Sequence, residues 1–218
     1  MIRKATLTFA LALVASSAAW AQDPRVEISG TAGWTFSDGV SGSNYQINGE
    51  DFTRVDPKDS ASWGARLGFF VTPNVEVGGL FNLQSTTMQI SGLGSTLDIG
   101  DEKTYNYHGY VAYNFGDSDA AVRPYFLGGL GATQYGAVNL PSGRTIDGNT
   151  KFSSTWALGL KLYPSNNVGL RLEARWTPTY IKSDAVGWWC DPYWGCYTLG
   201  DAQYANQFEL SGGINLRF

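Results

Sequence analysis

The sequence has little of what metal sites, nucleic-acid surfaces and membrane-spanning helices require. Its 218 residues include one histidine and two cysteines, too few ligands for an ordinary zinc site. The net charge is −4 and no basic cluster follows residue 4, which argues against the phosphate neutralisation on which nucleic-acid binding depends. After Gln22 no apolar run approaches the roughly 18 residues of a spanning helix. We therefore expect no metal, no cofactor and no nucleic-acid partner.

Residues 1–21 have the order of a secretory signal peptide. Arg3 and Lys4 precede an apolar stretch, and Ala19-Trp20-Ala21 supplies an A-x-A cleavage site. The apolar stretch is shorter than the roughly 20 residues that a membrane anchor needs. We expect cleavage before Gln22, which would leave one exported domain over residues 22–218. Because the removed segment holds two basic residues and no acidic ones, the net charge would move from −4 to −6.

The mature chain alternates apolar and polar residues with a period of two, the pattern of half-buried strands. The last strand is the clearest, with Glu209 and Arg217 on its polar face. Its apolar face carries Phe208, Leu210, Ile214, Leu216 and Phe218. Seven further segments alternate in the same way: 26–36, 63–71, 75–84, 105–115, 123–135, 155–162 and 168–177. In 123–135 the glycine-rich middle leaves open which face is which.

The spacers between these eight segments alternate in length. Short spacers cover 72–74, 116–122 and 164–167, whereas long polar ones cover 37–61, 91–103, 138–151 and 183–202. An even number of strands with short turns at one end and long loops at the other is typical of an all-β, eight-stranded antiparallel transmembrane barrel. A soluble sandwich or lipocalin-like barrel has the same period. Aromatic residues near the strand ends, such as Trp34, Trp63 and Trp176, favour the membrane interpretation.

Three stretches carry a resemblance to a known family: residues 123–131 (RPYFLGGLG), 169–175 (GLRLEAR) and 208–218. With these the chain resembles the small outer-membrane β-barrel proteins related to the OmpA transmembrane domain and to OmpX. The resemblance spans the mature chain. It implies a monomer in a Gram-negative outer membrane, in contact with outer-membrane lipid and lipopolysaccharide.

The final strand looks like the signal that the barrel-assembly machinery reads. The residues that would form this signal are Phe208, Leu210, Ile214, Leu216 and Phe218. The simpler interpretation is a last strand that needs an aromatic residue at the membrane interface, and both interpretations can hold together.

An eight-stranded barrel has an interior just wide enough for side chains to fill. Buried charges are costly unless they are paired, and the charges at inward positions are nearly balanced here. We expect an ion-pair network in the lumen, with individual pairs that the sequence does not fix. Its candidate members are Arg66, Lys161, Arg171, Glu173, Arg175, Glu209 and Arg217. The alternative is a selective channel lined by the same groups.

His108 is the one candidate general base of the usual kind, and its strand position points it inward. Outer-membrane lipid A deacylases and acyltransferases resemble the chain in size and location, but such chemistry needs a serine, a histidine and an acidic partner. No serine lies two residues from His108, and no serine motif stands out on the lipid face. We therefore predict a non-enzymatic protein without catalytic residues.

The last long loop contains both cysteines and a concentration of aromatic residues. Cys190 and Cys196 lie close together in an exported chain, which predicts a disulfide. A stacking platform for a sugar or a partner protein is one interpretation, and a lid or a headgroup contact is the other. The residues of this candidate platform are Trp188, Trp189, Tyr193, Trp194 and Tyr197. The first loop, 37–61, is acidic but lacks a calcium-loop pattern, so we predict a solvated loop.

By resemblance, the function would be envelope integrity, adhesion or resistance through the extracellular loops, with a surface ligand or host protein as partner. A narrow channel for ions or small solutes is the alternative, and it predicts conductance that changes when Arg171 or Arg175 is neutralised. A lipid-modifying enzyme that depends on His108 is the third hypothesis.

Overall fold

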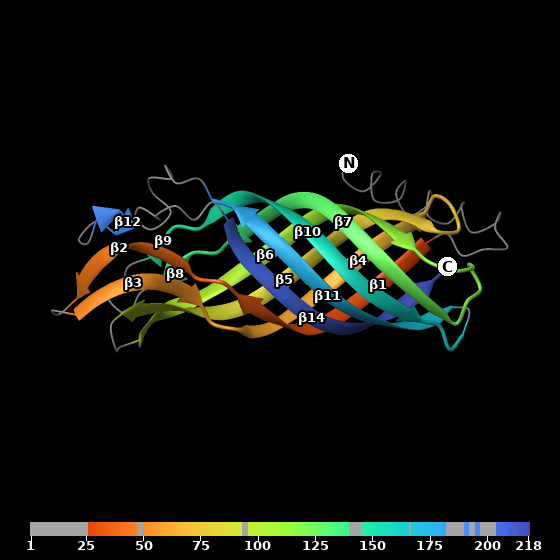
Figure 1. Ribbon diagram of the computed structural model, residues 1–218, viewed down its shortest axis with the longest axis horizontal. Helices are drawn as coiled ribbons and strands as arrows, with labels where there is room; N and C mark the ends of the chain where they lie inside the picture. Colours follow the sequence, from red (N-terminus) through yellow and green to blue (C-terminus); the bar gives the residue numbers. More distant parts are fainter. Residues whose placement is uncertain are drawn as a thin grey trace, which may run out of the picture.

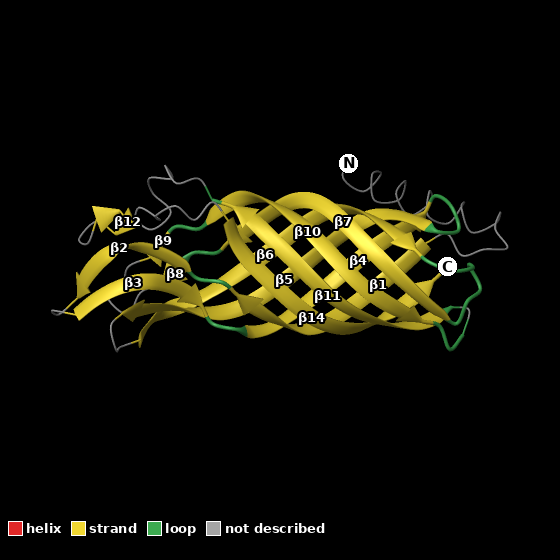
Figure 2. Cartoon of the chain, viewed as in Figure 1, coloured by secondary structure: helices red, strands yellow, loops and turns green. Residues whose placement is uncertain are grey.

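The computed structural model describes residues 26–47, 50–92, 96–139, 145–165, 167–181, 190–191, 195–196 and 204–218. The predicted signal peptide lies outside these residues. The regular secondary structure of the described part consists of strands (Figure 2). Within the same residues, no helix is long and apolar enough to cross a membrane.

Eight long strands form a closed antiparallel barrel (Figure 1). They are β1 (Val26–Ser37), β4 (Ser60–Phe70), β5 (Val75–Gly92), β6 (Thr96–Asn114), β7 (Val122–Tyr135), β10 (Asn149–Leu162), β11 (Val168–Tyr180) and β14 (Tyr204–Arg217). Each strand pairs with the next along this list, and β1 closes the barrel on β14, with Glu27 opposite Arg217. The predicted all-β, eight-stranded barrel is confirmed.

Side chains alternate between the two faces of the barrel wall, with apolar residues outside and polar residues inside. Ile214 and Leu158 are 55% and 64% exposed, whereas Asn215 and Thr155 are fully buried. A soluble barrel has the opposite arrangement, so the exposed apolar belt rejects that alternative. On β7, whose facing the sequence left open, Arg123 points inward and is 1% exposed.

The two ends of the barrel differ. At one end, which we call the turn end, short links join the strands, and the backbones of Val26 and Phe218 exchange hydrogen bonds. At the opposite loop end, β2 (Val40–Ile47) pairs with β3 (Glu50–Pro57), and β3 pairs with the far part of β5. Figure 1 shows this sheet projecting past the barrel. We call β2, β3, the next residue Lys58, and residues 86–92 and 96–102 the strand extension.

The strand extension corrects two loop predictions. Residues 37–61 and 91–103 were expected to be long polar loops, yet most of both segments is strand. The reason is that a strand beyond the membrane carries polar residues on both faces, so its alternation is weak although its backbone still pairs. Two short ladders occur in the remaining loops: β8 (Val138–Asn139) with β9 (Thr145–Ile146), and β12 (Cys190–Asp191) with β13 (Gly195–Cys196).

Candidate functional site

The lumen near the turn end is organised around two carboxylates. The Nζ atom of Lys161 lies 2.8 Å from Glu27 Oε1 and 2.6 Å from Glu76 Oε2. Arg171 Nη2 is 2.8 Å from Glu27 Oε1, and the Tyr163 hydroxyl donates to the same carboxylate. Tyr110 on β6 also donates to Glu76, and Arg217 on β14 reaches Glu27, so side chains from six strands meet at these two carboxylates. We group Glu27 and Glu76 with Arg123, Lys161, Arg171 and Arg217 as the turn-end cluster.

The middle of the lumen is crossed by a buried ion pair. Arg66 on β4 donates two hydrogen bonds to Glu173 on β11, and the Tyr125 hydroxyl donates to Glu173 as well. The strands β4 and β11 are separated by β1 and β14 in the barrel wall. This pair therefore reaches across the lumen between strands that are not neighbours in the barrel wall.

Glu209 forms the next level toward the loop end. Its Oε2 atom lies 2.6 Å from Arg175 Nη2, and it accepts hydrogen bonds from Ser62 at 2.9 Å and Asn82 at 2.8 Å. The donors come from three other strands. The carboxylate is therefore compensated by one cation and by neutral donors, as a buried charge requires.

Above Glu209 the lumen contains uncharged polar groups and then apolar ones. Asn106 donates to Gln207 at 3.1 Å, and Thr133 donates to Asn106 at 2.7 Å. Beyond this level a set of buried side chains, which we call the apolar cap, lies toward the loop end. Its members are Met88, Ile90, Tyr135, Val138 and Ile181.

His108 lies beside a serine that is distant in sequence. Its Nε2 atom is 2.8 Å from the Ser153 hydroxyl, while Nδ1 has no hydrogen-bond partner. Both residues are buried, at 4% and 1% exposure. A serine nucleophile needs a histidine that a third group orients, and a position that substrate can reach. The described residues place no carboxylate on Nδ1, and the pair faces the lumen rather than the lipid.

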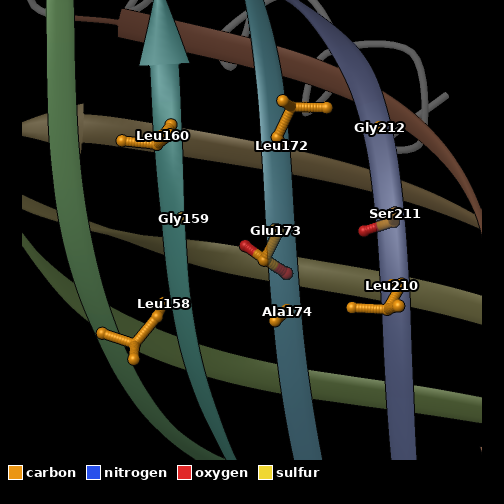
Figure 3. Close-up of a pocket in the computed structure, with 9 residues that line it drawn as sticks. All are labelled: Leu158, Gly159, Leu160, Leu172, Glu173, Ala174, Leu210, Ser211 and Gly212. Carbon is orange, nitrogen blue, oxygen red and sulfur yellow. The ribbon is translucent and has the colours of Figure 1, made fainter.

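The lipid-facing wall has a recess of about 610 Å³ over β10, β11 and β14 (Figure 3). Leu158, Leu172 and Leu210 line it from the three strands, and the small residues Ala174 and Gly212 form its shallow floor. The polar residues beside the recess belong to the other face, because Glu173 and Ser211 are 5% and 9% exposed. The described recess therefore offers an apolar surface to lipid chains without a nucleophile.

The strand extension carries charged residues beyond the interfacial aromatics. Lys58 Nζ is 2.8 Å from Asp98 Oδ2, and the Gln89 amide donates to Asp98 at 2.7 Å. These hydrogen bonds, from Lys58 first, lower the pKa of Asp98. Glu102, at the base of the extension, is buried, and this burial raises the pKa of Glu102 to about 8. The described residues hold no group of three or more potential metal ligands.

The structure brings the predicted lumen residues Arg66, Lys161, Arg171, Glu173, Arg175, Glu209 and Arg217 into the lumen. The residues of the candidate assembly signal all point outward from β14. Cys190 and Cys196 are direct register partners in β12 and β13, an arrangement compatible with the disulfide, which stays a prediction. The loop aromatics Trp188, Trp189, Tyr193, Trp194 and Tyr197 lie outside the described residues.

The candidate residues did not include five lumen groups that the structure places here: Glu27, Glu76, Arg123, Tyr125 and Tyr163. Tyr125 donates a hydrogen bond to Glu173 and Tyr163 donates one to Glu27. Arg123 is buried and shares the Phe70 ring with Lys161 and Arg217. A signal for Arg123 existed, because a charged residue in a membrane-spanning strand cannot face lipid cheaply. That rule would have fixed the facing of β7 and revealed Tyr125 on the same side.

Comparison with known proteins was consistent with this geometry. A family model described as the outer membrane protein beta-barrel domain matches residues 7–218. Comparison with curated proteins finds no match. The chain is similar to the solved structure of the outer membrane protein OprG from Pseudomonas aeruginosa, with TM-score 0.62, 12% identity and coverage of 90% of this chain and 96% of that one. It is also similar to Neisserial surface protein A (TM-score 0.57, 15% identity, 88% and 97% coverage) and to the outer membrane protein AlkL (TM-score 0.52, 14% identity, 91% and 93% coverage).

Proposed function

Because the chain belongs to the outer membrane protein beta-barrel domain family, we propose that it is a closed, non-conducting barrel that acts through its extracellular surface. In barrels of this kind the short turns are periplasmic and the long loops extracellular. The turn end therefore faces the periplasm and the strand extension faces the outside. The role would be envelope integrity or binding of a surface ligand or host protein, without catalysis.

The observation that carries this proposal is the filled lumen. Bonds between opposite walls occur at three successive levels: Lys161 with Glu76, Arg66 with Glu173, and Asn82 with Glu209. Each of these side chains is at most 5% exposed. An ion would have to break buried charge pairs to pass, at a cost of several kcal/mol per pair.

The strand extension supports a surface role. It continues the barrel wall with paired backbone well past the interfacial aromatic residues, and it displays charged side chains such as Lys58 and Asp98. A rigid, paired platform loses less conformational entropy on binding than a free loop does. This favours interaction with a partner at the cell surface.

The test is single-channel conductance of the refolded mature protein in a planar bilayer, with a heat-shifted gel mobility to confirm folding. We expect no discrete steps from folded protein. Reproducible steps whose size changes in Arg175→Gln would contradict the proposal and support the narrow channel instead. Lys58→Gln, which alters a charge outside the lumen, is the matched control.

The lipid-modifying alternative is tested separately. We expect cells that express the protein to have unchanged lipid A and phospholipid profiles by mass spectrometry. A new lipid product that disappears in both His108→Asn and Ser153→Ala would show that the buried pair is catalytic. Ser62→Ala, which removes another lumen hydroxyl, serves as the control.

A further inference from the structure

The turn-end cluster has more cations than carboxylates. At the next two levels of the described lumen each buried arginine has its own carboxylate, because Arg66 meets Glu173 and Arg175 meets Glu209. The turn-end cluster instead combines two carboxylates with four cations, none more than 5% exposed. Its carboxylates are Glu27 and Glu76, and its cations are Arg123, Lys161, Arg171 and Arg217. Among the side chains that the structure describes, this buried positive charge is therefore left without an equal number of negative partners.

Arg123 shows this lack most clearly. Its Nη2 atom donates to the backbone oxygen of Pro73 at 2.7 Å, and its Nε atom has no hydrogen-bond partner. Among the described residues no carboxylate oxygen lies within 4 Å of its guanidinium. A desolvated guanidinium with an unused N–H group is costly, so this arrangement points to a missing acceptor.

Two neighbouring arginines also have unused donors. Arg217 reaches Glu27 only at 3.4 Å through Nε, and its buried Nη2 atom has no partner. Arg171 uses Nη2 on Glu27, while its Nε and Nη1 atoms have none. Three buried guanidinium groups therefore offer N–H donors in the same end of the lumen.

Three of the four cations of the cluster lie around one aromatic ring at the turn end. The guanidinium carbons of Arg123 and Arg217 lie 5.9 and 5.7 Å from the centre of the Phe70 ring, and Lys161 Nζ lies 5.2 Å from it. Phe70 and Arg217 are the last residues of their strands, and Arg123 is the second residue of β7. The cluster therefore lies at the turn end of the barrel wall, within three residues of the strand ends, and not in the middle of the lumen.

We propose that this turn-end cluster binds a small oxyanion of the phosphate class between Arg123 and Arg217. Guanidinium groups present paired N–H donors that match the oxygens of phosphate, and such charge-assisted bonds are the stronger kind. The bound oxyanion supplies the acceptor that Arg123 lacks and offsets the excess positive charge. This site goes beyond the proposed surface role and does not depend on whether the barrel conducts.

The experiment is equilibrium dialysis of radiolabelled inorganic phosphate against the refolded barrel in a glycoside detergent, at fixed ionic strength. We expect saturable binding with one phosphate per barrel, and an affinity at least about tenfold lower in Arg123→Gln and in Arg217→Gln. Lys58→Gln removes an exposed cation at the opposite end and should bind phosphate like the wild type. Heat-shifted mobility confirms that each variant is folded.

Stability measurements provide a second readout on the same proteins. Without phosphate, Arg123→Gln should unfold at the same temperature as the wild type or higher, because the change removes an uncompensated buried charge. With phosphate, only the wild type and Lys58→Gln should gain stability, as expected for a ligand bound by the folded state. Absence of saturable binding to the wild type would overturn the proposal. Equal phosphate affinity in the wild type and all three variants would also overturn it. So would a loss of phosphate affinity in Lys58→Gln as large as that in the two arginine variants.

The phosphate group could be free or belong to a lipid headgroup. Displacement of labelled phosphate by equal concentrations of glycerol phosphate would show that the site accepts a headgroup phosphate. If unlabelled inorganic phosphate displaces the label and glycerol phosphate does not, the site binds the free ion. Either result supports an oxyanion site, whereas failure of unlabelled phosphate itself to compete would contradict it.

Discussion

Arg66 and Glu173 join opposite walls of the lumen, and neither side chain reaches solvent. We expect Glu173→Gln to lower the free energy of unfolding by about 3–5 kcal/mol, because it leaves the Arg66 charge buried without its partner. The double change Arg66→Met with Glu173→Met removes both charges and should recover most of that loss. The measurement is urea unfolding of the refolded protein, followed by tryptophan fluorescence.

An exposed pair is the control for this prediction. Lys58 and Asp98 lie 2.8 Å apart, but their side chains are 41% and 54% exposed. Solvent screens such a pair, so Lys58→Met should change the unfolding free energy far less than Glu173→Gln does. If Glu173→Gln proved as mild as Lys58→Met, the lumen would be wet and the closed-barrel proposal would weaken.

Glu102 should make stability depend on pH. Its pKa is raised from 4.5 to about 8 by burial, so between these values the folded carboxyl keeps a proton that the unfolded one releases. Unfolding then releases a proton, and stability falls as the pH rises through this window, by at most about 1.4 kcal/mol per pH unit. In Glu102→Gln the fall should be smaller.

The measurement is the thermal unfolding midpoint at pH 5 and at pH 8.5, for the wild type and for Glu102→Gln. Asp101→Asn is the matched control, because Asp101 directly precedes Glu102 in β6 and is exposed. An identical pH dependence in the wild type and in Glu102→Gln would show that Glu102 is ionised at neutral pH in the folded protein.

At the scale of the strand, close approach of backbones explains why some glycines are required. A Cβ atom at Gly131 on β7 would collide with the carbonyl oxygen of Tyr107 on β6, whereas one at Gly79 on β5 would meet nothing within 4 Å. Gly131→Ala should therefore cost about 1–3 kcal/mol or more, and Gly79→Ala should change stability by about 0.5 kcal/mol or less. Urea unfolding of the two variants compares the same chemical change at both positions, and equal effects would contradict the close approach.

The strands were predictable where the membrane enforces alternation. Segment 168–177 places Leu170 and Leu172 on lipid and Arg171 and Glu173 in the lumen, because a charge facing lipid is costly. Outside the membrane that constraint disappears, and the strand extension was therefore interpreted as loop. In β7 the glycines carry no side chain to mark a face, so the sequence did not show which of its residues face the lumen.

The composition of the lumen was predictable, but its pairing was not. Inward positions follow from the period of two, which identified Arg66 and Glu173 separately. Their meeting depends on the stagger of strands that are not neighbours in the barrel wall, and this stagger is set by the whole closed ladder. The same dependence hides the His108 and Ser153 contact, which joins β6 to β10 across β7.

At the scale of the whole molecule, closure depends on the two terminal strands. The β1 and β14 ladder runs from Glu27 opposite Arg217 to Ser37 opposite Gln207, and the backbones of Val26 and Phe218 extend it at the turn end. These bonds use main-chain atoms, while the Phe218 ring is 61% exposed on the lipid side. The ring is therefore not needed to close the barrel, which leaves interfacial anchoring or recognition during assembly as its role.

Phe218→Ser separates these two roles. After refolding in detergent, we expect its heat-shifted mobility to match that of the wild type, because the closing hydrogen bonds do not involve the ring. In cells, we expect severalfold less folded protein in the outer membrane if the assembly machinery reads Phe218. Phe115→Ser is the control, because Phe115 is a 49% exposed aromatic at the same end but follows β6. An equal decrease of folded outer-membrane protein in both variants would indicate that Phe218 acts only as an interfacial anchor. An assembly signal in the last strand cannot depend on Phe115.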